Sequence, residues 1–122
     1  MASPGAEATA AITITRGVVV VTMRPDMDGE QFDSMRRSVL ERIACTKSRA
    51  LVLDFSGIDV MNLLEFNRIR KLLFAARLLG AETAMVSLAP GIVLYLTEVA
   101  AETGDFSYFF GLDEALRQYG DQ

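Results

Sequence analysis

A short, uninterrupted apolar run from Ala50 to Phe55 constrains the fold of this chain more than any other feature. Asp54 is the only polar residue in the run, and Ser56-Gly57 end it. A strand with one face in water alternates apolar and polar residues, so a run without alternation predicts a strand that is buried on both faces. Parallel sheets covered by helices bury their strands in this way. The run therefore predicts the interior of an α/β sheet.

The flanking sequence supplies the other elements of such a fold. Ile12 to Met23 predicts two antiparallel strands joined by a tight turn at Arg16-Gly17, with the first strand at the sheet edge and Pro25 ending the second. Two more strands and four helices are expected: strands Glu82–Leu88 and Ser107–Phe110, and helices from Glu30 to about Cys45, Asn62 to about Leu79, Ile92 to about Glu102, and Gly111 to about Tyr119. The order ββαβαβαβα predicts an α/β fold with a single, mostly parallel mixed sheet of about five strands and about four helices.

Length and charge limit the classes of protein to consider. A chain of 122 residues holds one domain, which we expect over residues 11–122, after a disordered lead-in over residues 1–10. The net charge of −4 argues against nucleic acid as a partner. A single cysteine, Cys45, predicts a reducing, cytoplasmic setting, and no apolar run is long enough to span a membrane.

The residues that carry most enzyme chemistry are missing. The chain has no histidine, which is the commonest general base and metal ligand, so we expect no enzyme activity, no cofactor and no metal. Asp26, Asp28 and Glu30 form the densest carboxylate cluster, but their spacing fits a turn before a helix better than a calcium loop. Asp54 and Asp59 flank the exit of the apolar strand without a nucleophile or base beside them, which favours loop and cap roles.

The second helix carries two apolar stripes at helical spacing. The stripe expected to face the sheet contains Phe66, Ile69, Leu72, Leu73, Ala76 and Leu79. The stripe on nearly the opposite side contains Leu63, Leu64, Phe74 and Leu78, interleaved with Asn67, Arg70 and Lys71. A surface helix needs only one apolar stripe, so the second predicts an interaction surface or the cover of a neighbouring helix.

Several segments together resemble the STAS domains of anti-sigma factor antagonists and of small stressosome scaffold proteins. The resemblance covers Ile12 to Leu116 and rests on Leu51–Asp59, Leu78–Glu82, Ala89-Pro90, Thr103–Phe106, Phe109 and Leu112–Leu116. It implies a STAS fold and a role in binding other proteins.

The chain departs from the family pattern at the start of the second helix. Members of the family usually carry an aspartate and a phosphorylatable serine here, where this chain has Asn62 and Leu63, and Glu65 stands where a glycine is usual. Leucine has no hydroxyl, so phosphorylation at Leu63 is excluded, while Ser56 stays open as an acceptor. Either the site has degenerated without consequence, or the surface is always competent to bind. Stressosome scaffolds usually have Arg before the proline that starts the next helix, whereas this chain has Ala89, which weakens that comparison.

The resemblance predicts an interaction module in a partner-switching or stressosome-like system. Its partner would be an anti-sigma factor kinase or other STAS proteins, with homo-oligomers left open. The alternative is an accessory subunit that binds the ATPase of an ABC transporter in lipid transport. The predicted partner-binding residues are Ser56, Asp59, Asn62, Leu63, Leu64, Asn67, Arg70, Lys71, Phe74 and Leu78.

Overall fold

A computed structural model describes residues 11–99 and 106–121, which form one five-stranded sheet in the order β1-β2-β3-β4-β5. The predicted disordered lead-in, residues 1–10, lies outside the described residues. The strands are β1 Ala11–Thr15, β2 Val18–Thr22, β3 Ala50–Asp54, β4 Glu82–Val86 and β5 Ser107–Phe109. The sheet is mixed and mostly parallel, as predicted, because only β1 and β2 pair antiparallel.

The central and edge strands of this sheet lie where the sequence predicted them. β3 lies at the centre of the sheet and Ala50, Leu51, Val52 and Leu53 are fully buried, which confirms the prediction from the apolar run. β1 lies at the edge, as expected, and turns into β2 through Arg16 and Gly17, with φ of 55° and 80°. Positive φ at both turn residues matches the right-handed twist of a hairpin.

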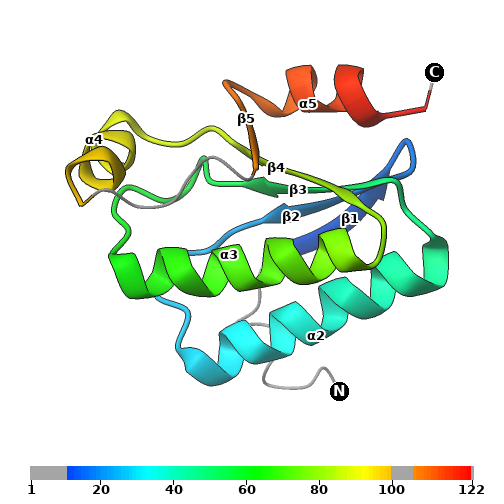
Figure 1. Cartoon of the computed structure of the whole chain (residues 1–122), viewed down its shortest axis with the longest axis horizontal. Helices are drawn as coiled ribbons and strands as arrows, with labels where there is room; N and C mark the ends of the chain where they lie inside the picture. Colours follow the sequence, from blue (N-terminus) through cyan, green and yellow to red (C-terminus); the bar gives the residue numbers. More distant parts are fainter. Residues whose placement is uncertain (1–10, 100–105, 122) are drawn as a thin grey trace.

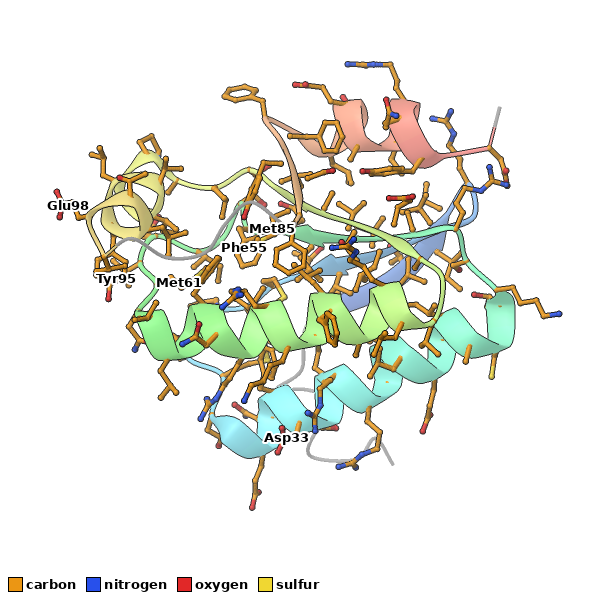
Figure 2. All side chains as sticks on the ribbon, viewed as in Figure 1. Asp33, Phe55, Met61, Met85, Tyr95 and Glu98 are labelled. Atoms are coloured by element: carbon orange, nitrogen blue, oxygen red, sulfur yellow. The ribbon has the colours of Figure 1, made fainter. Side chains whose placement is uncertain are left out.

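Helices cover both faces of the sheet (Figure 1). Their bounds are α2 Gly29–Thr46, α3 Leu63–Leu78, α4 Pro90–Glu98 and α5 Leu112–Tyr119. Helices α2 and α3 lie side by side on one face, α5 covers the other face, and α4 stands at one end of the sheet (Figure 1). The sheet residues alternate between two cores, one against α2, α3 and α4 and the other against α5. Figure 2 shows Phe55 and Met85 inside the first core, with Met61 toward the start of α3.

Two expectations about the helices were wrong. Leu79 was placed on the buried stripe, but α3 ends at Leu78 and Leu79 is its half-exposed C-cap. The chain leaves the helix there because Gly80, at φ 93°, takes the left-handed conformation that commonly ends a helix. Helix α4 ends at Glu98 rather than near Glu102, and Glu102 itself lies outside the described residues.

Strands β4 and β5 are also shorter than predicted. β4 ends at Val86, and the next residue, Ser87, takes a left-handed φ of 61° that departs from strand geometry, so Leu88 lies beyond the strand. β5 ends at Phe109, and Phe110 is almost entirely exposed. The carboxyl ends of both strands therefore open into loops near α4.

Candidate functional site

The start of α3 is fixed by a reciprocal pair of hydrogen bonds. The Glu65 N–H donates to Asn62 Oδ1 (2.8 Å), and the Asn62 N–H donates to Glu65 Oε1 (2.9 Å). This capping box satisfies two of the N–H groups that a helix start leaves without a partner in the helix. It holds Leu63 at the first helical position with 38% of its surface exposed. Leu63 therefore lies at the surface, in the first turn of α3.

The two stripes of α3 separate as the sequence predicts, apart from Leu79. The inner stripe is buried against the sheet: Phe66, Ile69, Leu72, Leu73 and Ala76 are all less than 5% exposed. On the outer face, the exposed fractions are 62% for Leu64, 59% for Phe74 and 73% for Leu78. No neighbouring helix covers these three side chains within the described part of the chain. Cover by another of the described helices therefore does not account for them.

A hollow of about 890 Å³ lies along this outer face. Six of the predicted partner-binding residues line it: Leu64, Asn67, Arg70, Lys71, Phe74 and Leu78. Inside the hollow, an Arg70 Nη1–H donates to Asn67 Oδ1 at 3.5 Å, a long bond between partly buried side chains. We call the exposed apolar side chains of Leu64, Phe74 and Leu78, with the hollow around them, the α3 outer surface.

Two further residues line the hollow, and neither was predicted from the sequence. Arg77 lies three residues after Phe74 on the same helix, so helical spacing alone points to it. Phe106 comes from the segment before β5, and only the folded chain brings it there.

The structure places Ser56 and Asp59 in a different region. Both line a mostly apolar groove of about 780 Å³ at the carboxyl ends of β3 and β4, beside α4 and β5. The Ser56 N–H donates to Asp54 Oδ1 (2.9 Å), which forms the turn that leaves β3, and the Ser56 side chain is exposed. Asp59 is exposed as well. The ten predicted residues thus divide between this groove, the α3 start and the α3 outer surface.

The remaining candidates from the sequence have structural roles. Asp28 is the N-cap of α2, where it accepts a hydrogen bond from the Gln31 N–H at 2.8 Å, so the acidic cluster belongs to a helix start. Within residues 11–99 and 106–121, no three metal-ligating side chains gather into a candidate metal site. None of the helices in those residues has the length and apolar character needed to cross a membrane.

Comparison with known proteins gives a family match and several fold matches. A model of the STAS domain matches residues 9–101. The RsbT co-antagonist protein RsbRD of Bacillus subtilis (strain 168) is 25% identical over 107 residues, which are 88% of this chain but only 38% of that protein. The chain thus spans well under half the length of this relative.

Solved structures agree on the fold. Moorella thermoacetica RsbS with a serine-to-glutamate substitution has a TM-score of 0.78 at 19% identity, over 90% of this chain and 93% of that one. A chain from the stressosome, described as a signal integration and transduction hub, has a TM-score of 0.78 at 18% identity over 89% and 95%. An anti-sigma-factor antagonist (STAS) domain protein from Planctomyces limnophilus has a TM-score of 0.73 at 13% identity over 91% and 97%.

Proposed function

Because this chain belongs to the STAS domain family, we propose that it is a non-catalytic protein-interaction module of the anti-sigma factor antagonist type. It would act in the cytoplasm, in a partner-switching or stressosome-like signalling system. Its relatives by sequence and by fold include an RsbT co-antagonist and a stressosome protein, which supports a signalling role. The absence of histidine supports binding rather than catalysis.

The observation that carries the proposal is the α3 outer surface. Leu64, Phe74 and Leu78 expose apolar side chains on one face of a helix whose opposite face is already buried. Apolar area that gathers in one place on a soluble domain marks an interaction site. Phe74 is the strongest candidate for an anchor, since aromatic side chains dominate the binding energy of many interfaces.

The start of α3 gives this module its specific character. We propose that Leu63 stands where the family usually has its phospho-acceptor serine. Leu63 lies one residue before Leu64 and is partly exposed. In the resembling family, the unphosphorylated serine is the state that binds the partner. We therefore propose that this surface is permanently competent to bind, and that its regulation comes from the partner or from another site such as Ser56.

The test is capture of partners from the native host by the tagged chain, identified by mass spectrometry. Wild type and Phe74→Ala are compared with Val93→Ala, a change of another exposed apolar side chain that lies on α4, away from the α3 outer surface. We expect an anti-sigma kinase or STAS-domain partner that wild type and Val93→Ala retain and Phe74→Ala loses. A partner that Phe74→Ala retains fully would contradict the proposed surface. Capture of a transporter ATPase in place of these partners would contradict the signalling role.

A further inference from the structure

A second hollow adjoins the α3 outer surface, between α2 and α3. It is a groove of about 610 Å³, lined from α2 by Arg36, Arg37 and Leu40 and from α3 by Lys71, Ala75 and Leu78. The two helices lie side by side on one face of the sheet (Figure 1), and the lining residues place the groove between them.

The groove and the α3 outer surface are continuous. Lys71 and Leu78 line both hollows, and Phe74 lies one turn of helix before Leu78. We call the combined area the α2–α3 surface. This combined surface extends over both hollows. Its centre is apolar and contains Leu40, Phe74 and Leu78.

The rim of this surface is cationic although the chain as a whole is acidic. Arg36, Arg37 and Lys71 line the groove with one carboxylate, Glu41, whereas the chain carries 16 acidic and 12 basic residues. Arg36 also forms an exposed ion pair with Asp33 (3.4 Å), and Figure 2 shows Asp33 on the side of α2 away from the sheet. Arg37 and Lys71 are both exposed, so the charge argument depends chiefly on these two residues.

The continuing hollow on α3 has the same sign of charge. Arg70 and Arg77 line it, and among the residues that the structure describes no carboxylate does. Both arginines already have interactions within the chain, so we count them as a background of positive charge rather than as the pairing groups.

These observations, together with the proposed function on which this step depends, define the chemistry of the partner. We propose that the α2–α3 surface receives an acidic amphipathic helix of another protein. The apolar face of that helix would lie against Leu40, Phe74 and Leu78, and its flanking carboxylates would meet Arg37 and Lys71. An apolar groove that takes a helix with apolar residues at i, i+3, i+4 and i+7 is a recurring mode of recognition. Opposite charges across the rim speed association and exclude wrong partners.

The same charges disfavour two other occupants. A second copy docking through the same surface would place cations against cations, because a two-fold interface pairs a patch with itself. A flat anionic membrane would match the charge, but a groove recessed between two helices fits a rod better than a plane.

The experiment uses three synthetic helical peptides with one shared leucine face and a polar face of Glu, Gln or Lys. Binding to the full chain is measured by fluorescence anisotropy. We expect the Glu peptide to bind at least ~10-fold tighter than the Gln peptide, the Lys peptide to show no binding, and the Glu affinity to fall as salt is raised. Arg37→Glu with Lys71→Glu should remove the preference. Arg42→Glu with Arg117→Glu changes the charge equally at exposed positions outside the surface, and should keep it.

Three results would overturn the proposal. Equal binding of the Glu and Gln peptides would show that charge plays no part. Self-association of the wild type that Arg37→Glu with Lys71→Glu abolishes, seen by sedimentation, would make a second copy the occupant. Binding to phosphatidylserine vesicles in the absence of binding to the Glu peptide would make it a membrane.

The native partner separates this inference from the proposed function. If Phe74→Ala loses the captured partner but Arg37→Glu with Lys71→Glu keeps it at high and low salt, the proposed function stands and the acidic helix is wrong. If Phe74→Ala keeps the partner, the proposed function fails whatever the peptides show.

Discussion

Asn62 and Glu65 cap one another at the start of α3, each accepting a hydrogen bond from the other's backbone N–H, at 2.8 and 2.9 Å. In the family pattern that this chain resembles, an aspartate and a glycine are usual at the positions expected for these two residues. An aspartate can cap a helix as asparagine does, but a glycine at the third helical position has no side chain to reach back. The Glu65 side chain, which a glycine would lack, supplies the second half of the capping box in this chain. The altered positions form a consistent local structure around Leu63.

The capping box predicts a measurable cost for its removal. Asn62→Ala should lower the free energy of unfolding by about 1 kcal/mol, in the range of about 0.5–2 kcal/mol seen for N-cap residues. Chemical denaturation measures it. Because the two side chains act reciprocally, Asn62→Ala with Glu65→Ala should cost less than the sum of the single changes.

A matched control for the cap lies one turn further along the same helix. Asn67→Ala removes a partly buried amide that accepts a long hydrogen bond of 3.5 Å from Arg70, and it should cost less than Asn62→Ala. Equal costs at the two positions would mean that the cap contributes nothing beyond an ordinary surface amide.

Two phenylalanines on α3 test which face the helix presents. Phe74 is 59% exposed, so Phe74→Ala should change the free energy of unfolding by no more than about 1 kcal/mol. Phe66 is fully buried, and Phe66→Ala should cost about 3–5 kcal/mol through lost burial and the cavity left behind. Urea denaturation of both variants gives the comparison. A cost at Phe74 that approaches the cost at Phe66 would mean that the outer face is covered in solution.

Much of this fold follows from local pattern in the sequence. The unbroken apolar run of β3 predicted a strand buried on both sides, and the spacing of Phe66 and Phe74 predicted the two faces of α3. Both predictions use periodicity, which is a property of neighbouring residues. The same reasoning failed at Leu79. The apolar spacing includes Leu79, but the helix ends at Leu78 and Gly80 turns the chain away in a left-handed conformation.

The candidate site was predictable only in part, since its shape depends on tertiary contacts. Arg77 follows from helical spacing, but Phe106, Arg36 and Arg37 come from segments distant in the chain. Ser56 and Asp59 are close to Leu63 in sequence, yet they line the groove beside α4. The loop from Ser56 to Asn62 is long enough to lead away from the end of β3, and sequence proximity does not reveal its path.

Gly17 ties the first hairpin to the C-terminal segment. Its φ is 80°, and a Cβ at this position would come within 2.8 Å of Asp121 Oδ2. Asp121 also forms an ion pair with Arg49, and the Asp121 N–H donates to the Arg16 carbonyl (2.8 Å). Gly17→Ala should therefore destabilise the domain by more than about 1 kcal/mol. Gly91→Ala is the control, since Gly91 lies in α4 with open space around it, and it should be neutral or stabilising by up to about 1 kcal/mol. In thermal melts, the melting temperature should fall for Gly17→Ala and stay or rise for Gly91→Ala. A similar fall in both variants would contradict a special requirement for glycine at position 17.

The last prediction restores the family's usual pair at the start of α3. We expect Asn62→Asp with Leu63→Ser to become a substrate of the kinase partner, because position 63 is exposed and lies at the first helical residue. A phosphate would add about −1.5 to −2 charges at pH 7. A helix N-terminus stabilises anions, so the phosphorylated domain should stay folded.

The cost of that phosphate should appear in the complex. A partner surface that now contacts a leucine would have to bury a dianion, which is unfavourable without new pairing groups. We expect the double variant to bind like wild type until it is phosphorylated and then to be released, measured by pull-down with and without ATP. Asn62→Asp with Leu63→Ala supplies the control, because it keeps the aspartate but offers no hydroxyl, and its binding should not respond to ATP. If the phosphorylated variant binds as tightly as wild type, the start of α3 is outside the interface, and the partner contacts the helix only further along, around Phe74.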